Sequence, residues 1–566
     1  MPQDAFTLRH IAQELDAKLA GGKVNKIIQP SRDEADILLY AGGRTEKLLL
    51  NTNASMARAC LSQAPRTAPD AAPNFCMLLR KHLTGAALRS VAQVGFERIL
   101  AFTFDCAGEF VRAERVLYAE IMGKYSNLIL CENGTVLGAL KVSSLQENYK
   151  RALFPGVPYR LPEPQDKADP SDTRALAARL SAFAGGDLAA FLADNAAGLA
   201  LSTCRILVRE TGLDGAGPLQ SEEKAAAAAA LVHAFVFSDE VCPAVERTPA
   251  GEAKDFHARF AGGERRESVL AAADAYYTER ENARAFAEKK RRLESVLLSR
   301  KKKEEKKLAL LCERERACAD MEKNRIAGEL ITANIYALQK GMAHCELVNY
   351  YDEAAKTVEI ALDVNLTPAQ NAQKYYKKYN KQKRTLAAVA PQKEEVLAEL
   401  EYADSLAAAL GRAEGMLDLA ELEEELRAAG FLPPEQKRKK AAAPAPFRTF
   451  RFGGFEVLAG RNNVQNDRLL REAAPRDVWL HTQKYHSAHV LIRSGGRPVP
   501  GDVLLAAAEV CAWFSDAKAG GKVPVDHCER RFVKKPPKAR AGFVTYTDFK
   551  TVLAVPARHA EAETDR

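Results

Sequence analysis

Three closely spaced histidines are the first residues in the sequence that could support chemistry. His481, His486 and His489 carry imidazole nitrogens, which are common zinc ligands. No carboxylate cluster accompanies them, and none of the 11 cysteines forms a CxxC pair. Because a histidine in a strand-rich segment is more often packed or hydrogen-bonded than metal-bound, we predict no metal site and no cofactor.

The start of the chain offers a candidate nucleophile. After removal of Met1, the amine of Pro2 could form a Schiff base, as in base-excision glycosylases. Those enzymes need an acid directly after the proline, whereas this chain has Gln3, and the four-cysteine zinc element that many of them carry is absent. No P-loop, GxSxG or dinucleotide-binding fingerprint is present either. The sequence therefore predicts a binding protein rather than an enzyme, with no catalytic residues.

Basic residues interleaved with aromatic ones suit contact with RNA. Segment 374–384 contains six Lys or Arg residues, three tyrosines and no acid, and segment 529–540 contains six basic residues and one acid. Cations neutralise phosphates, and rings stack on bases. The two prolines of the second segment are expected to keep it extended. The residues predicted to contact RNA or the ribosome are Lys374, Tyr375, Lys377, Lys378, Lys381, Arg530, Arg531, Lys534, Lys535 and Lys538.

A plainer interpretation of both basic segments stays open. A charge run on a helix is usually a solvated face, and segment 529–540 could be an exposed basic loop. The net charge of the 566 residues is only +8, so clustering matters more than the total. No stretch approaches the roughly 20 apolar residues of a membrane span, and the scattered cysteines fit a reducing compartment. We therefore expect a cytoplasmic protein without a membrane partner.

Two long helices must position the first basic segment. Asp274 to Arg325 is almost free of helix breakers, and an unbroken helix over this range would be roughly 80 Å long. Thr367 is a plausible N-cap of a second helix, with Pro368 at its first position. Pro391 is expected to kink or restart this helix, and Gly430 to follow its C-terminal end.

The spacing of apolar residues predicts that the two helices pair. Leu386, Val389, Val396 and Leu400 approximate a three-to-four-residue seam. An antiparallel coiled-coil hairpin over residues 263–430 would satisfy this seam, with a small structured tip at 328–366.

The rest of the chain predicts globular domains and hence a multidomain α+β protein. Residues 1–168 combine a helix at Phe6–Leu19 with several strands, and Asn133-Gly134 predicts a hairpin. Residues 169–262 are Ala-rich and helical, with breaks at Gly198 and Gly212. They could form a helix-hairpin-helix that presents backbone amides to phosphate, or an ordinary helical bundle. Residues 431–446 are expected to be a linker, and 447–566 a domain of strands around a helix.

Ordered motifs along the chain resemble one family. They are GFERIL, EIMGKYSNLIL and FPGVPYRLPEP near the start, GELITANIY, TPAQNAQKYYKKYNK and EEELRAAGFL in the middle, and AGRNNVQNDRLL, DVWLHTQ and KVPVDHCERRFVKKPPKARAGFVTY near the end. In this arrangement the chain resembles the NFACT family over essentially its whole length. The resemblance implies a glycosylase-like α/β-sandwich (NFACT-N), a helix-hairpin-helix region, a coiled-coil hairpin and a C-terminal NFACT-R domain.

The resemblance also implies a function in ribosome quality control. Family members bind a large ribosomal subunit, through its rRNA, while peptidyl-tRNA still obstructs it. They recruit a charged tRNA, in bacteria mainly alanyl-tRNA, so that the stalled chain gains an alanine tail that marks it for degradation. The peptidyl-transferase centre forms the bonds, the factor supplies positioning, and a small RNA-binding tailing co-factor is a further expected partner.

Six residues of the first domain are expected to bind tRNA by their match to family motifs. Relatives usually have Asp where this chain has Glu97, so this position is a conservative departure. A second departure lies at His486-Ser487-Ala488-His489, where relatives commonly read Pro-Gly-Ser-His, and the loss of Gly predicts a different backbone there. The expected tRNA-binding residues are Glu97, Arg98, Asp4, Lys124, Ser126 and Asn127.

Alternative readings of these family matches remain. Glu97 and Arg98 could form an internal strand salt bridge, and the polar groups at 124–127 could hold either phosphate or a tight turn. An older family name describes members as fibronectin-binding, so a surface adhesin is the alternative function, although the sequence shows no signal peptide, wall anchor or disulfide framework. A DNA glycosylase-like protein is the third, weaker alternative.

Overall fold

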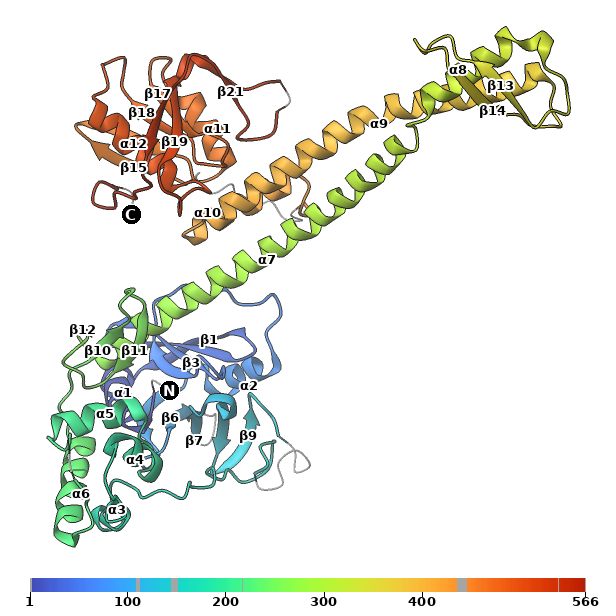
Figure 1. The fold of residues 1–566 in the computed structure, drawn as a ribbon. Coiled ribbons are helices and arrows are strands. Elements are labelled where there is room, and N and C mark those ends of the chain that lie inside the picture. Colours follow the sequence, from blue (N-terminus) through green and yellow to red (C-terminus); the bar gives the residue numbers. More distant parts are fainter. Residues whose placement is uncertain are drawn as a thin grey trace. The chain divides into compact units, whose positions relative to one another are not determined.

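The computed structural model describes residues 3–107, 112–143, 151–215, 217–434, 445–537 and 539–564 (Figure 1). It is a multidomain α+β structure with a large antiparallel sheet. The contacts divide the chain into two compact units, Met1–Ala283 and Arg284–Arg566.

A nine-stranded antiparallel sheet forms the centre of the first unit, in the order β4-β3-β2-β1-β5-β6-β7-β8-β9. Its strands are β1 (Lys23–Ser31), β2 (Glu34–Ala41), β3 (Arg44–Asn51), β4 (Arg58–Leu61), β5 (Ala87–Gln93), β6 (Ile99–Ala107), β7 (Arg112–Glu120), β8 (Asn127–Glu132) and β9 (Thr135–Ala139). Asn133 and Gly134 both have positive φ and join β8 to β9, as the sequence predicts.

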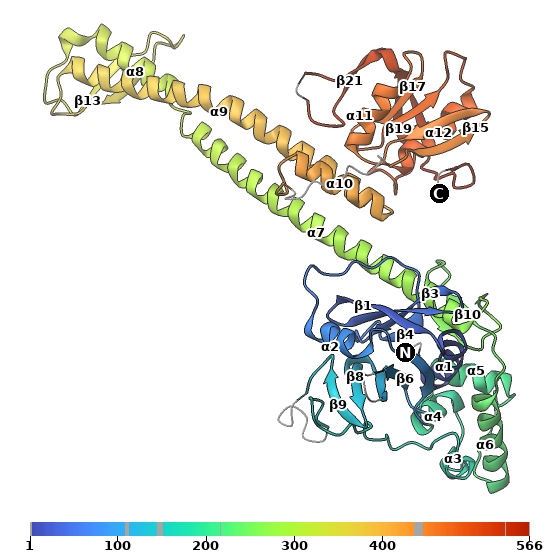
Figure 2. The same ribbon diagram turned by 180° about the vertical axis from the view of Figure 1, so that it is seen from behind.

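Two helices pack against this sheet, α1 (Ala5–Leu19) and α2 (Asn74–Leu83); Figure 2 shows α2 from behind. Leu8, Ile11, Leu15 and Leu19 are fully buried, because their spacing places them on one face of α1. The helix predicted at Phe6–Leu19 is therefore confirmed.

The next region begins as the sequence predicts and then departs from it. Four helices follow the sheet: α3 (Thr173–Leu180), α4 (Leu188–Asn195), α5 (Leu201–Glu210) and α6 (Glu222–Phe237). The expectation of helix throughout this region is wrong after α6, where β10 (Ala244–Arg247), β11 (Ala253–His257) and β12 (Glu264–Arg265) form a small sheet. Val245 pairs with Phe256 and both are buried, so side-chain packing favours strands once the Ala-rich stretch ends.

Helix α7 (Val269–Arg316) begins inside the core of the first unit. The carboxylate of Glu14 accepts hydrogen bonds from the backbone amides of Val269 and Leu270 at 2.8 and 2.9 Å, which satisfies orphan donors at the helix start. Tyr276 and Tyr277 are buried there. The first turns of the predicted arm are therefore part of a globular core.

Buried charges surround this helix base. The Arg58 guanidinium, 2% exposed, lies 2.5 Å from Glu281 and 4.7 Å from the ring centre of Tyr277. Asp36 is fully buried, and neither of its carboxylate oxygens has a hydrogen-bond partner among the described residues. Burial, reinforced by the nearby Glu34 charge, raises the pKa of Asp36 to about 7.

Loss of the Arg58 guanidinium should destabilise the first unit. Arg58→Ala removes the buried guanidinium and leaves the Glu281 carboxylate with Arg66 as its remaining partner, and we expect a loss of about 3 kcal/mol in the free energy of unfolding. Amide hydrogen exchange along β4 in the full chain measures this change. Arg284→Ala removes an exposed pair with Glu288 and should change stability by less than about 0.5 kcal/mol. Equal protection in both variants would refute a stabilising role for the buried pair.

The raised pKa of Asp36 predicts a pH dependence of stability. The folded unit holds a proton that the unfolded chain releases above the ordinary pKa near 3.8. This contribution is fully present below that pH and is lost as the pH rises through about 7, a change on the order of 4 kcal/mol. Asp36→Asn should flatten the pH dependence of unfolding between these limits. Asp105→Asn, on β6, should leave this pH dependence in place. Parallel curves of unfolding free energy against pH for the wild-type chain and Asp36→Asn would contradict the prediction.

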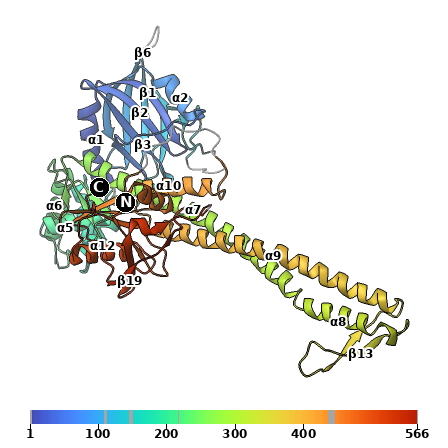
Figure 3. The ribbon, with the colours of Figure 1, turned by 90° about the horizontal axis from the view of Figure 1, so that it is seen from above.

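The second unit contains the rest of the arm. Leu293 packs in a cluster with Leu406 and Leu410, and Leu311 packs with Val389 and Val396, so α7 and α9 (Pro368–Gly411) run antiparallel (Figure 3). The buried seam at Val389 and Val396 matches the predicted one. Helix α10 (Met416–Ala428) folds back beside α9.

Four details of the predicted arms are decided by the structure. The first helix does not run to Arg325: α7 ends at Arg316 and α8 (Met321–Ala333) follows, so α7 is about 72 Å long rather than roughly 80 Å. Pro391 lies inside α9 and does not restart it. Thr367 caps α9 through Gln370, as predicted. Gly430, with φ 76°, follows α10 and not α9, because α9 ends at Gly411 and the second predicted helix is divided into two.

A small tip joins α7 to α9. It contains α8, the short turn Ile335–Ala337, β13 (His344–Val348) and β14 (Thr357–Ala361). Leu330, Ile331 and Ile360 form its core with Ala372 of α9. The start of α9 is therefore held by tertiary packing as well as by its cap.

The C-terminal domain is a six-stranded antiparallel sheet in the order β15-β16-β18-β17-β19-β22 with two helices. Its elements are β15 (Arg448–Phe452), β16 (Phe455–Ala459), α11 (Asn463–Glu472), β17 (Val478–Thr482), β18 (Val490–Arg493), α12 (Gly501–Trp513), β19 (Val523–Glu529), the turn Arg530–Phe532, β20 (Val533–Lys534), β21 (Thr545–Tyr546) and β22 (Lys550–Ala554). The sequence predicts α12 but misses α11, whose polar composition hides its periodicity.

Candidate RNA-binding surfaces

The start of α9 gathers the first predicted set of RNA-binding residues. Lys374, Lys377, Lys378 and Lys381 recur at helical spacing, so their side chains share one face. Together with Tyr375 and residues 361–363 they line a hollow of about 640 Å³. The structure therefore brings all five predicted residues of this segment to one place.

Two of these five residues bond to neighbouring residues, and the other three form no ion pair among the described residues. Lys374 pairs with Asp363 at 2.9 Å, and the Tyr375 hydroxyl donates to the backbone oxygen of Ala361 at 2.6 Å. Lys377, Lys378 and Lys381 are exposed and form no ion pair within the described ranges. Because Tyr375 also packs against the tip core, its ring is less free to stack on a base than the sequence suggests. The unpaired ammonium groups suit phosphate contact.

In the first unit, Glu97 and Arg98 lie in the turn between β5 and β6, where Gly95 has φ 57°. They are not inside a strand, where the alternative of an internal strand salt bridge places them. The Gln93 side chain donates to the Glu97 backbone oxygen at 2.8 Å and fixes the turn. Partial burial raises the pKa of Glu97, while the charge of Arg98 opposes this shift.

A second loop leaves the same end of the β6–β7 pair. Ile121 donates its backbone N–H to the Arg98 backbone oxygen at 2.8 Å, and the segment Gly123–Tyr125 then forms a tight turn. Lys124 is exposed, and its ammonium lies 4.9 Å from the ring centre of the equally exposed Tyr125. Lys124 and the Glu97–Arg98 turn therefore lie at one edge of the sheet.

Ser126 and Asn127 hold this loop rather than facing solvent. Both are buried. The Ser126 hydroxyl accepts from the Met122 amide at 2.7 Å, and the Asn127 side chain both accepts from and donates to the backbone of Lys141 at 2.8 Å. Of the two roles that the sequence leaves open, a tight turn is the one that these contacts support.

Asp4 also has a structural role. It is 3% exposed, and its two carboxylate oxygens accept from the amides of Thr7 and Ala200 at 2.9 Å. It therefore caps α1 and ties it to the start of α5. These contacts argue against the predicted direct contact of Asp4 with tRNA.

One glycine brings the helical region against the Glu97–Arg98 turn. Gly198 has φ 75°, and a Cβ there would lie 2.6 Å from the Cβ of Ala5 and 2.9 Å from the Phe96 backbone oxygen. Its own backbone oxygen accepts from Ala5 N–H at 2.8 Å. Only glycine fits this position, so the predicted helix break also sets a close approach.

The second basic segment begins with a turn rather than the extended chain predicted. The Arg530 guanidinium donates to the Leu470 backbone oxygen at 2.7 Å, so this side chain supports the domain. Arg531 pairs with Glu529 at 2.8 Å, and Lys535 pairs with Asp467. Lys534 is exposed and forms no ion pair with described residues. Lys538 lies outside the described residues.

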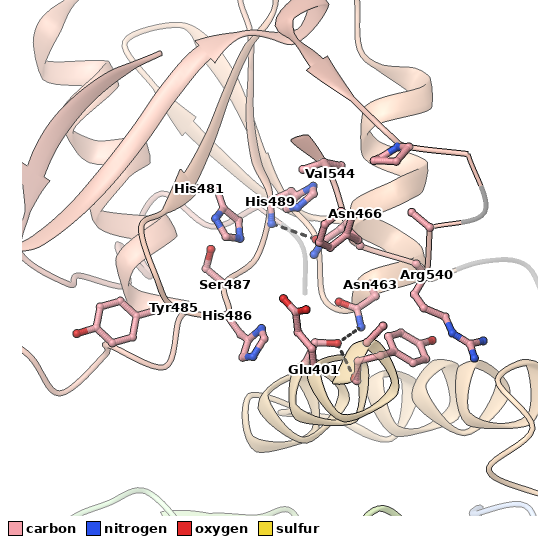
Figure 4. Close-up of a pocket in the computed structure, with 18 of the residues that line it drawn as sticks. Glu401, Asn463, Asn466, His481, Tyr485, His486, Ser487, His489, Arg540 and Val544 are labelled. Atoms are coloured by element: carbon pink, nitrogen blue, oxygen red, sulfur yellow. Dashed lines mark hydrogen bonds between the residues drawn. The ribbon is translucent and has the colours of Figure 1, made fainter. Parts of the chain in front are cut away.

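A pocket of about 1120 Å³ lies between α9 and the C-terminal domain (Figure 4). The sequence does not predict this pocket, because the walls of the pocket come from segments far apart in the chain. Trp479, His481 and His489 form one wall and Glu401 faces them from α9. Burial, with the nearby charges of His486 and Arg412, lowers the pKa of His481 to about 4. Burial also holds the pKa of His489 well below its usual value.

These histidines pack as aromatic rings. The rings of Trp479 and His481 are stacked at 5.7 Å, and that of His489 meets both edge-on. No group of three or more His, Cys, Asp or Glu residues among those described is placed to hold a metal ion. Ser487, which replaces the Gly of relatives, does not have positive φ, so this backbone does not require glycine.

The fold and these surfaces define a multidomain protein with separate basic regions suited to RNA. Its sequence matches the family models described as NFACT N-terminal and middle domains, over residues 4–444, and NFACT protein RNA binding domain, over residues 446–539. The chain belongs to the NFACT family.

Similar proteins are named Rqc2 homolog RqcH. The chain is 33% identical over 573 residues to that of Bacillus subtilis (strain 168), and 30% identical over 566 residues to that of Streptococcus suis (strain 05ZYH33); each alignment covers 98% of both chains. A solved N-terminal structure of the fibronectin/fibrinogen-binding protein from Streptococcus suis is 28% identical, with a TM-score of 0.41, and covers 49% of this chain and 99% of that chain. None of the helices in the described ranges is long and apolar enough to cross a membrane.

The exposed lysines of the α9 hollow generate a prediction. The double change Lys377→Ala with Lys378→Ala should weaken binding to purified large ribosomal subunits about tenfold or more and lower the slope of log K against log salt by about 1 to 2. Filter binding over a salt series measures both. Lys340→Ala with Lys356→Ala removes two exposed lysines of the same tip that do not line the hollow. An equal loss in the control pair would show that net charge, not this cluster, governs binding.

Proposed function

We propose that this chain is a ribosome-associated quality-control factor. It binds the large ribosomal subunit while peptidyl-tRNA obstructs it, and it recruits a tRNA that extends the stalled chain. The observation that carries the proposal is similarity over 98% of the chain to proteins named Rqc2 homolog RqcH. The RNA-binding family domain and the exposed lysines of α9 support it.

The proposal assigns different RNAs to different surfaces. The Glu97–Arg98 turn, with Lys124 at the same sheet edge, would receive tRNA. A guanidinium in such a turn can fork onto phosphate or a guanine edge, and the Glu97 carboxylate can accept from a base amine. Lys377, Lys378 and Lys381 on α9, with Arg531 and Lys534 of the C-terminal domain, would contact rRNA.

Finer parts of the proposal rest on family membership. The tRNA would be alanyl-tRNA, the product a C-terminal alanine tail that marks the chain for degradation, and a small RNA-binding protein would assist. The architecture would be a glycosylase-like NFACT-N domain (1–168), a helix-hairpin-helix region (169–262) built on α4 and α5, a coiled-coil hairpin (263–430) and, after a linker (431–446), NFACT-R (447–566).

The factor would act by positioning rather than by its own catalysis. Holding a charged tRNA beside the stalled chain supplies proximity, and the ribosome's peptidyl-transferase centre would form the bond. The proposal therefore assigns no catalytic residue and no cofactor, and places the protein in the cytoplasm with its ribosomal partner.

Arg98 gives the sharpest test of the tRNA surface. Arg98→Ala should weaken tRNA capture about 5- to 100-fold, because a forked charged contact is lost, and should abolish tailing of stalled chains. Gel shift with the tRNA pool and a tailing assay on obstructed large subunits measure the two effects. Glu97→Asp, which restores the residue common in relatives, should retain both activities.

Arg89→Ala is the matched control for this test. Arg89 lies on β5 of the same sheet and pairs with Asp105 and Glu114 at the surface. This variant should bind tRNA normally, since its pairs lie in solvent and contribute little to stability. Normal tailing by Arg98→Ala would remove the tRNA role from this turn.

Affinity purification with sequencing of bound RNA tests the function as a whole. Large-subunit rRNA with one enriched tRNA would support the proposal and identify the amino acid added. rRNA without an enriched tRNA would leave a ribosome-binding factor without tailing. Absence of RNA above background would favour the alternatives of a fibronectin-binding adhesin or a DNA glycosylase-like protein.

A further inference from the structure

The pocket between α9 and the C-terminal domain is held open by polar contacts between its two walls. Asn463 of α11 donates to the Ser405 hydroxyl of α9 at 3.0 Å. Arg412, just after α9, donates to the His486 backbone oxygen at 3.3 Å and to Asp516 at 3.0 Å. Both walls belong to the same compact unit. The pocket is therefore part of the packed structure, and its volume of about 1120 Å³ is enough for a ligand of nucleotide size.

The domain wall of this pocket is aromatic. Trp479 is fully buried, stacks on His481 and meets the ring of Tyr546 at 4.9 Å. Tyr485 also lines this wall, and Tyr402 lines the pocket from α9. Such a wall favours a flat ring over a flexible chain, because stacking needs a planar partner.

The opposite wall adds an acceptor. Figure 4 shows Glu401 rising from α9 toward Ser487 and His486 across the pocket. An amine on the edge of a base could donate to this carboxylate, as cytosine and adenine do, whereas uracil offers only a carbonyl oxygen at the corresponding position.

The rim decides how a nucleotide could enter. Glu395 and Glu399 line the α9 side, where negative charge disfavours phosphate. Glu399 is paired with Arg540. Lys484 lines the domain side and is exposed. A phosphate backbone would therefore follow the domain side and leave the base to enter the pocket.

We propose that this pocket binds an unstacked base of single-stranded RNA, one that carries an exocyclic amine. The base lies against the His481 and Tyr546 rings, which are partly exposed, and its amine donates to Glu401. Single-stranded RNA is commonly recognised by splayed bases stacked on aromatic side chains. The inference rests on the proposed function, since it names the kind of RNA that the C-terminal domain would take.

Trp479 fluorescence can report entry of the base through the His481 ring, which stacks on the buried indole. The chain has two tryptophans, so Trp513→Phe leaves Trp479 as the single one. A short oligocytidylate should quench Trp479 on binding, and an oligouridylate of equal length should quench it several-fold less. Cytidine monophosphate should need a concentration about tenfold or more higher, because a single nucleotide lacks the neighbouring backbone contacts.

Ala398→Phe should block the pocket without disturbing a hydrophobic core. Ala398 is exposed on α9 and lines the pocket, whereas Ala407 is exposed on the opposite face of the same helix. In the Trp513→Phe background, Ala398→Phe avoids a second indole signal, and Ala407→Phe is its matched control. The blocked variant should lose the quenching and bind oligocytidylate about tenfold more weakly, and the control should match the parent.

Each contrary result has a distinct meaning. Oligonucleotide binding without quenching, equal quenching by cytidylate and uridylate, or unchanged binding by Ala398→Phe would overturn the proposal. Equal affinity for the mononucleotide would make the pocket a free-nucleotide site and also overturn it. Sedimentation of the same variants with large subunits distinguishes failure of the pocket proposal from failure of the proposed function. If the parent chain does not co-sediment, the ribosomal function fails whatever the fluorescence shows.

Discussion

The packing of α9 is the constraint on which the second unit depends. A helix of this charge content is marginal in water by itself, because nucleation is costly and its polar faces bury nothing. Leu311 on α7 with Val389 and Val396 on α9, and Leu293 with Leu406 farther along, give it an apolar seam. One continuous helix thereby carries the lysine-lined hollow at its start and one wall of the aromatic pocket near its end. With about 20 residues between them, the two sites lie roughly 30 Å apart along the helix axis.

Buried polar contacts fix the C-terminal domain to helices α9 and α10. Asn462 and Gln465 at the start of α11 donate to Glu421 of α10 at 2.6 and 2.7 Å, and the buried Arg448 lies near Asp418. Burying so many polar groups is favourable only if they are paired. Their geometry therefore specifies one orientation of the domain on α9 and α10, and that orientation creates the pocket.

The distribution of paired and unpaired charge separates structural residues from candidate binding residues. The side chains of Arg58, Arg530 and Asp4 form hydrogen bonds to other groups inside the protein. Lys377, Lys378, Lys381 and Lys534 face solvent without an ion pair among the described residues. In the first unit, Gly198 and the buried Ser126–Asn127 pair hold the two loops that carry Arg98 and Lys124.

The sequence by itself determined the features that depend on local spacing and on motifs. These include α1 from its buried periodicity, the Asn133-Gly134 hairpin, the Thr367 cap, the seam of α9 and the family. Tertiary structure alone decided the strands after α6, the break between α7 and α8, and the burial of Asp4, Ser126 and Asn127. It also decided the pocket, since Trp479, His489 and Glu401 come together only when α9 and the C-terminal sheet pack. A local sequence pattern reflects the stability of a helix turn or a hairpin. Burial and pairing depend on residues distant in the chain, which no local pattern contains.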